Sequence, residues 1–171
     1  MTTGEQFLFF TQKQFHNYKE LGEKAMKQIS DEKLFFRPDE ETNSIAMIIQ
    51  HMSGNMLSRW TDLLITDGEK DWRNRDREFE VVLKTKDEVL QKWGEGWNCL
   101  FSAMAGISAD QLSMIVLIRN EPQTLLEAIN RQIAHYAYHI GQIVYVSKQN
   151  REKDWQTLSI ARQKNPNTTT I

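Results

Sequence analysis

The chain has 171 residues, of which 40% are hydrophobic and 26% charged, and its formal net charge is −2. This length and composition are typical of one globular domain with a substantial hydrophobic core. A net charge so close to zero gives no reason to expect nucleic acid or a membrane surface as a partner. No uncharged apolar segment approaches the roughly 20 residues that a membrane-spanning helix needs.

The single cysteine, Cys99, limits both the chemistry and the compartment. One cysteine can form neither an intramolecular disulfide nor a cysteine-rich zinc motif, so a metal site would have to use histidine, carboxylate and water. The segment Met1–Gln6 lacks the charged and apolar regions of a signal peptide. We therefore expect a cytoplasmic protein in which Cys99 is a buried apolar residue rather than a nucleophile.

Hydrophobic periodicity predicts an all-α fold. The low content of glycine and proline, 8 and 3 residues, agrees with this prediction. Helix-start signals support it further, since Asn43 or Ser44 can cap the second helix, and Thr85-x-x-Glu88 and Thr124-x-x-Glu127 are capping-box patterns. The four predicted helices cover residues 5–29, 45–65, 86–105 and 123–148.

Three segments outside these helices carry specific predictions. Residues 66–84 contain a charged loop that we expect Trp72 and Phe79 to anchor on the helices. Met114–Ile118 is rich in β-favouring residues and predicts an extended segment or short strand, which Asn120-Glu121-Pro122 is expected to end. Residues 150–171 are predicted to dock as an extended segment through Trp155 and Leu158 and then to end in a flexible tail.

The most informative stretch is His135-x-x-x-His139 in the fourth helix. Residues four apart lie on one helix face, with Cβ atoms roughly 5–6 Å apart, so both imidazoles can converge on one metal ion. No charged residue occurs from Gln132 to Ser147, which indicates a buried helix. Its polar stripe, which includes Gln132 and Gln142, must then meet either a metal or hydrogen-bonding partners inside the core.

The second helix has the same character. It is uncharged from Asn43 to Ser58 and carries His51 near its middle. Two buried helices that both present imidazole are difficult to explain by packing alone. Three nitrogen ligands, His51, His135 and His139, would leave one coordination position open, as in reactive metal sites. His16 lies in a charged stripe of the first helix, and we expect it to be a solvated surface residue.

Other residues are candidates for contacts with a substrate. Asn55 lies one turn from His51 and, with Tyr138, can orient a bound molecule; a helix–helix hydrogen bond is the alternative for Asn55. Arg59, Trp72 and Arg75 are the candidate contacts for a cofactor or an anionic substrate. For Arg59 the alternative is an ion pair with Asp62. The charged loop is either a salt-bridged surface loop or the entrance for a negative substrate, lined by Arg73, Arg75 and Arg77.

Taken together, a histidine in the second helix and His135-x-x-x-His139 in the fourth resemble the DinB/YfiT-like superfamily of metal-binding helical bundles. The resemblance covers about residues 5–160 and includes His51-Met52-Ser53-Gly54-Asn55-Met56, Asp67-Gly68-Glu69-Lys70-x-Trp72-Arg73-x-Arg75-Asp76 and His135-Tyr136-x-Tyr138-His139-x-Gly141-Gln142. These motifs look like those of a small bacterial branch. The resemblance implies an up-down-down-up four-helix bundle, often a homodimer, with zinc or nickel on His51, His135 and His139.

Characterised members of that superfamily include S-transferases and isomerases that depend on a low-molecular-weight thiol. The resemblance therefore implies a metal-dependent enzyme that transfers such a thiol to an electrophilic small molecule. A metal-dependent hydrolase is the alternative within enzymes, although His135-x-x-x-His139 lacks the glutamate of metalloproteases. Two further classes stay open: a non-catalytic metal-binding or stress-associated bundle, and a purely structural helical dimer that binds no metal.

Overall fold

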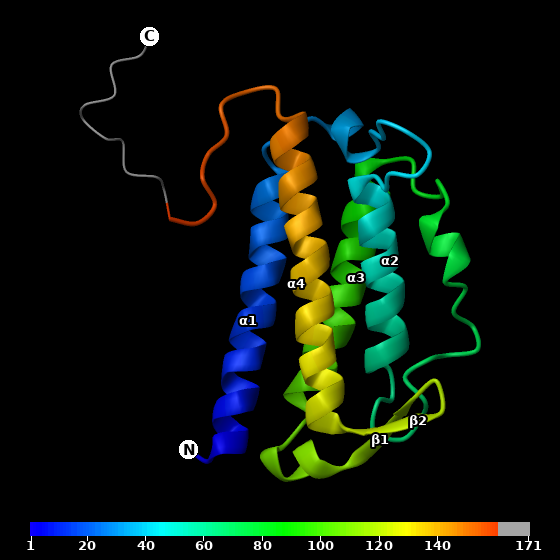
Figure 1. Cartoon of the computed structure of the whole chain (residues 1–171), viewed down its shortest axis with the longest axis vertical. Coiled ribbons are helices and arrows are strands. Elements are labelled where there is room, and N and C mark those ends of the chain that lie inside the picture. The colour runs from blue at the N-terminus through cyan, green and yellow to red at the C-terminus, as the bar shows by residue number, and fades with distance from the viewer. Residues whose placement is uncertain (161–171) are drawn as a thin grey trace.

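A computed structural model describes residues 1–160, in which four long helices lie side by side (Figure 1). The predicted helical bundle is broadly confirmed, with the addition of a two-stranded sheet at one end. Three short 3₁₀ helices occupy the connections, at Asp31–Leu34, Asp76–Phe79 and Ala109–Ser113. The long helices are α1 (Thr3–Met26), α2 (Ile45–Trp60), α3 (Lys86–Ala105) and α4 (Leu125–Asn150).

Side-chain caps fix where the helices begin. Ser44 caps α2 by accepting a hydrogen bond from the backbone N–H of Met47. Thr85 and Thr124 form the predicted capping boxes with glutamates three residues later, at the starts of α3 and α4. None of the helices within residues 1–160 is long and apolar enough to cross a lipid bilayer.

Helix α2 ends at Trp60, five residues before the predicted end at residue 65. Thr61 has an extended backbone, and Asp62 follows in the left-handed region with a φ of 50°. The chain then turns back, so that Ser58 Oγ donates a hydrogen bond of 2.9 Å to the carbonyl of Gly68. Tertiary contacts of α2 with the following loop therefore override the apolar pattern that predicted a longer helix.

Tyr136 lies at the centre of the core. Its side chain is fully buried, between the rings of Phe15 and Trp97 at centroid distances of 5.8 and 6.0 Å. The hydroxyl accepts a hydrogen bond of 2.9 Å from Trp60 Nε1 and donates one of 3.0 Å to Asn55 Oδ1. A buried hydroxyl without partners would be costly, so this network fixes how α2 and α4 face each other.

The sheet is a β-hairpin that joins α3 to α4. β1 (Ile115–Ile118) pairs antiparallel with β2 (Glu121–Thr124) through a two-residue turn at Arg119 and Asn120. The predicted strand is confirmed and ends before Asn120 as expected, but Glu121 and Pro122 begin a second strand that was not predicted. Pro122 faces Leu117, one position beyond the pair that flanks the turn, where an antiparallel ladder needs no N–H from it.

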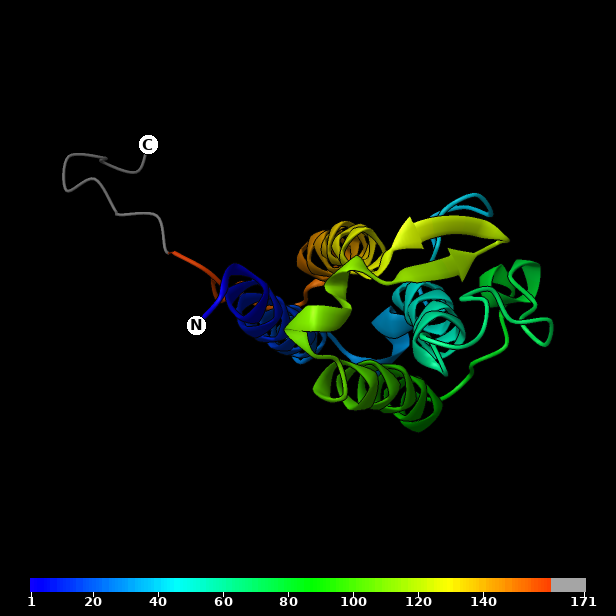
Figure 2. The same cartoon turned by 90° about the horizontal axis from the view of Figure 1, so that it is seen from below.

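Residues 61–85 form a long crossover from the end of α2 to the start of α3, and its short helix Asp76–Phe79 packs on α2 (Figures 1 and 2). Trp72 was predicted to anchor this loop, but 61% of its surface is exposed. The anchors are charged instead, because the side chains of Arg73 and Glu78 keep only 2% and 8% of their surface exposed. Phe79, the second predicted anchor, is half-buried and stacks on His51.

The C-terminal segment docks on the bundle as predicted. Trp155 and Leu158 are partly buried against the core. Gln28 also exchanges two hydrogen bonds, of 3.1 and 2.8 Å, with the backbone of Gln156. The flexible end predicted for the tail lies, from residue 161 onward, outside the described residues.

The close approach of α2 and α3 generates a first prediction. A Cβ on Gly96 would lie 2.9 Å from the Cα of Ser53, which is backbone and cannot rotate away. We expect Gly96→Ala to lower the free energy of unfolding by about 1–3 kcal/mol in equilibrium urea titrations, since overpacking outweighs the better helix propensity of alanine. Gly94→Ala is the matched control, because a Cβ there meets nothing within 4 Å. Equal stability of the two variants would contradict this account of the interface.

Candidate metal centre

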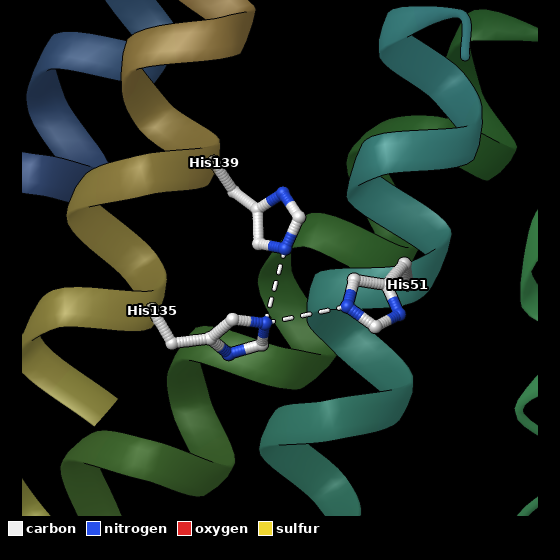
Figure 3. Close-up of side chains that lie close together, drawn as sticks. All are labelled: His51, His135 and His139. Carbon is white, nitrogen blue, oxygen red and sulfur yellow. Dashed lines mark hydrogen bonds between the residues drawn. The ribbon is translucent and has the colours of Figure 1, made fainter. Parts of the chain in front are cut away.

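Three histidines from two helices meet at the centre of the bundle. His51 comes from α2, and His135 and His139 come from successive turns of α4 (Figure 3). The Nε2 atom of His135 lies 3.3 Å from that of His51 and 3.0 Å from that of His139. One ligand atom from each of the three residues lies within 4.8 Å of the other two. The three histidines predicted from the sequence are thus brought together.

The outer nitrogens of two of these rings have hydrogen-bond acceptors. His51 Nδ1 donates to Glu78 Oε2 at 2.8 Å, and His139 Nδ1 donates to Gln142 Oε1 at 2.8 Å. A proton held on Nδ1 leaves a lone pair on Nε2 of a neutral imidazole. Such outer acceptors are typical of metal-binding histidines, where they fix the tautomer and the ring orientation.

Burial keeps two of the rings neutral. Burial, together with the neighbouring His139 and His51, lowers the pKa of His135 from 6.5 to about 3. Burial likewise lowers the pKa of His139 to about 4, despite its hydrogen bond to Gln142. Both imidazoles are therefore unprotonated near neutral pH and can donate lone pairs to a cation.

The hydrogen-bonding pattern of the three rings leaves the cluster able to hold a cation. With Nδ1 protonated on His51 and His139, the Nε2 atoms of both rings present lone pairs to His135 Nε2. A single N–H on His135 can donate to only one of them, which leaves the lone pair of the other ring without a donor. Nitrogens bound to a tetrahedral zinc ion lie about 3.3–3.4 Å apart, given metal–nitrogen distances of about 2.0–2.1 Å. The separation of 3.3 Å between His51 and His135 matches that requirement, the separation of 3.0 Å between His135 and His139 is somewhat shorter, and all three ligand atoms lie within 4.8 Å of one another.

Glu78 is itself held by Arg73. Arg73 Nε donates to Glu78 Oε1 at 2.7 Å and Nη2 donates to Oε2 at 2.9 Å, a two-pronged ion pair. Burial opposes ionisation of this carboxyl, but the hydrogen bonds from Arg73 and His51 outweigh it and lower the pKa of Glu78. The carboxylate is thus charged and oriented toward the imidazole of His51.

Gly54 makes room for this carboxylate on α2. A Cβ at this position would lie 2.2 Å from Glu78 Oε1. A glutamate side chain can ordinarily move away, but here any movement would break its bonds to Arg73 and His51. The glycine therefore allows the loop to approach the histidine cluster.

A cavity of about 250 Å³ opens beside His51 and His135. Of the candidate contact residues, Asn55, Arg59 and Arg75 line it, whereas Trp72 and Tyr138 do not. Tyr138 is 62% exposed and lies edge-on to His139 at a centroid distance of 4.9 Å.

Two further residues can be placed. The prediction that Arg59 pairs with Asp62 was wrong. Arg59 Nη2 instead donates a hydrogen bond of 2.9 Å to Glu69 Oε2, because the chain turns away from the helix at Asp62. His16 is exposed, as expected, and stacks on Phe101 away from the cluster.

A family model described as "Protein of unknown function (DUF1572)" matches residues 2–164. The chain belongs to the DUF1572 family. A search of curated proteins gave no match.

Two residues beside the histidines were not predicted in the positions that the structure gives them. Glu78 was not a candidate, and Arg73 was considered only as part of a substrate entrance. Both lie in a loop of alternating charge, where no helical period indicates which side chains point inward. A partial signal existed in α4, because Gln142 belonged to the polar stripe of His135 and His139.

The second prediction concerns Glu78, whose carboxylate accepts the hydrogen bond from His51 Nδ1. We expect Glu78→Gln to weaken zinc affinity about 10- to 100-fold, since loss of a partner behind a ligating histidine has effects of that size. The measurement is a competition titration with a coloured zinc chelator. Glu80→Gln is the matched control, because Glu80 lies in the same loop and is exposed. If both variants bound zinc like the native chain, Glu78 would have no part in the centre.

Proposed function

We propose that the chain holds one divalent metal ion, zinc or nickel, on the Nε2 atoms of His51, His135 and His139. We further propose that it is an enzyme that transfers a low-molecular-weight thiol to an electrophilic small molecule. The observation that carries the proposal is the convergence of three imidazole nitrogens beside a cavity. Three protein ligands leave a position for a reactant, whereas structural zinc sites are closed by four.

Membership of the DinB/YfiT-like superfamily is part of this proposal. The helical bundle and the histidines on α2 and α4 support it. So does the long crossover at residues 61–85, which agrees with the up-down-down-up order of helices in that superfamily (Figure 1). With the superfamily we also propose a homodimer, and a cytoplasmic location in which a thiol cofactor would stay reduced.

A divalent ion held by three neutral imidazoles keeps its full charge and lowers the pKa of a thiol or water that binds to it. The protein groups around it have separate tasks. Glu78 and Gln142 hold the tautomers of His51 and His139, and Arg73 holds Glu78. Asn55 accepts a hydrogen bond from Tyr136 through Oδ1, so its amide NH₂ group is the donor available to a substrate.

The proposed reaction is a nucleophilic substitution. The thiol loses its proton to solvent, and its sulfur forms a bond to an electrophilic carbon. The bond from that carbon to the leaving group breaks, and the electron pair departs with the leaving group. No oxidant or reductant is needed.

The cavity favours thiol transfer over hydrolysis. Hydrolysis calls for a general base that takes a proton from water within hydrogen-bond reach. No aspartate or glutamate within residues 1–160 lines this cavity, and Glu78 is engaged by Arg73 and His51. A thiol loses its proton far more readily than water and depends less on such a base.

The third prediction concerns the metal. Protein purified without a histidine tag should contain, or take up, about one equivalent of zinc or nickel by elemental analysis. The His135→Ala/His139→Ala variant should contain none, whereas His16→Ala, which removes a surface histidine, should match the native chain. Protein that is metal-free and cannot be loaded with zinc, nickel, manganese or iron would end the three-histidine proposal.

The fourth prediction concerns turnover. Metal-loaded protein should accelerate the reaction of a low-molecular-weight thiol with a model electrophile such as a chlorinated nitroarene. The thioether product is measured by mass spectrometry across a panel of thiols. The rate should fall to the uncatalysed level in His135→Ala/His139→Ala. Stoichiometric metal without turnover of any thiol would instead indicate a non-catalytic metal-binding protein.

A further inference from the structure

The cavity beside the metal centre has an unusual charge. Its volume is about 250 Å³, enough for a small molecule or part of one, and no aspartate or glutamate lines it within the described part of the chain. Five of the nine residues that line it are arginines: Arg59, Arg73, Arg75, Arg119 and Arg131.

Nearby carboxylates neutralise these arginines only in part. Glu69 lies within ion-pair distance of Arg59, Arg73 and Arg119, and Glu78 pairs with Arg73. Across residues 1–160, neither Arg75 nor Arg131 is in ion-pair distance of a carboxylate. Even when the nearby Asp67 is counted with Glu69 and Glu78, five arginines against three carboxylates leave a surplus of two positive charges in a chain whose net charge is −2. A concentrated positive field in a cleft attracts anionic ligands.

The backbone is arranged to bring Arg119 to this cavity. Arg119 and Asn120 both adopt left-handed conformations, with φ of 58° and 61°, which are uncommon for arginine. The carboxylate of Asp67 accepts hydrogen bonds from both backbone N–H groups, at 2.9 and 2.7 Å. The turn therefore holds a cationic side chain at a place where glycine or asparagine would be the ordinary choice.

Arg75 is also placed next to a histidine of the centre. Its guanidinium lies over the ring of Phe79, 5.5 Å from the centroid. Phe79 in turn stacks on His51 at 4.7 Å. Arg131 lies four residues before His135 on α4, which puts the two on the same face and roughly 6 Å apart along the helix axis.

Two buried polar atoms of the lining have no partner. Arg59 Nε lacks an acceptor and Gln132 Oε1 lacks a donor, although each residue is only 4% exposed. Buried polar groups are normally paired, so these two atoms are hydrogen-bonding capacity that the protein itself leaves unused. An anionic oxygen would serve Arg59, and a hydroxyl or amine on the same molecule would serve Gln132.

We infer that the substrate of this centre carries a phosphate or carboxylate group, bound by Arg75, Arg119 and Arg131 about one helical turn from His135. The inference rests on the proposed function only in taking this anion as part of the reacting molecule. Bidentate pairing with oxyanions is what guanidinium groups do best. The anion would hold its molecule with the reactive end toward the three histidines.

The test measures anion binding to protein freed of metal on a chelating resin. Inorganic phosphate and malonate are titrated calorimetrically at low ionic strength, with sodium chloride at matched ionic strength as the reference. We expect saturable binding of one anion per chain, and the tighter probe would identify phosphate or carboxylate as the group recognised. Absence of saturable binding for both probes overturns the inference.

Variants locate the site. Arg131→Gln and Arg75→Gln should each weaken anion binding about tenfold, the typical cost of one charge-assisted hydrogen bond. Both residues are exposed, so the variants should fold, which thermal unfolding checks. Arg151→Gln removes the same charge at the far end of α4 and should change binding less than about twofold. Equal binding by all three variants overturns the inference.

The outcomes separate this inference from the proposed function. The His135→Ala/His139→Ala variant should lose metal but still bind the anion, because Arg75, Arg119 and Arg131 are unchanged. Anion binding by a protein that cannot be loaded with metal would leave the inference standing and remove the metal proposal. Metal binding without anion binding would leave the metal proposal standing and overturn the inference.

Discussion

The buried ion pair between Arg73 and Glu78, with His51 on its other side, is the constraint on which the rest of the centre depends. Removing one member of a buried pair typically costs about 3–5 kcal/mol, because the remaining charge is left without a partner. Here the hydrogen bond from His51 to Glu78 also fastens the crossover at residues 61–85 to α2. The same carboxylate that holds the loop in place orients His51, so the fold of the loop and the geometry of the histidine cluster cannot vary independently.

The positions of the three histidines could be predicted because the two helices that carry them are uncharged over several turns. Burial of those helices follows from that pattern, and the spacing of His135 and His139 follows from helix geometry. The alignment of α2 with α4, which brings His51 opposite His135 and His139, depends on Tyr136. Its hydroxyl joins Trp60 and Asn55. A network of this kind is a tertiary property, and the sequence indicated only that such polar groups need partners.

The residues around the histidines were harder to predict for a physical reason. Glu78 and Arg73 lie in a loop, where side-chain direction follows no period, and alternating charge there is usually a solvated surface. Trp72 was expected to be buried because aromatic residues usually are, yet it is 61% exposed while its charged neighbour Arg73 is buried. Arg59 was expected to pair with Asp62, three residues on, but the helix ends between them and the left-handed turn at Asp62 removes that geometry.

The two charge features of the site act on each other. Burial keeps His135 and His139 neutral, so the ligands themselves bring no charge to a bound cation. The arginines bring a surplus of positive charge to the wall of the same cavity. A cation bound to the histidines and the guanidinium groups of the arginines are both positive and repel each other, and the repulsion is strong where water is excluded. An anion between them relieves it on both sides, so a cation on the histidines and an anion on the arginines favour each other's binding, and by linkage the two effects are equal. With the proposed function, we therefore expect this centre to hold a metal ion most firmly when the proposed anion is also bound.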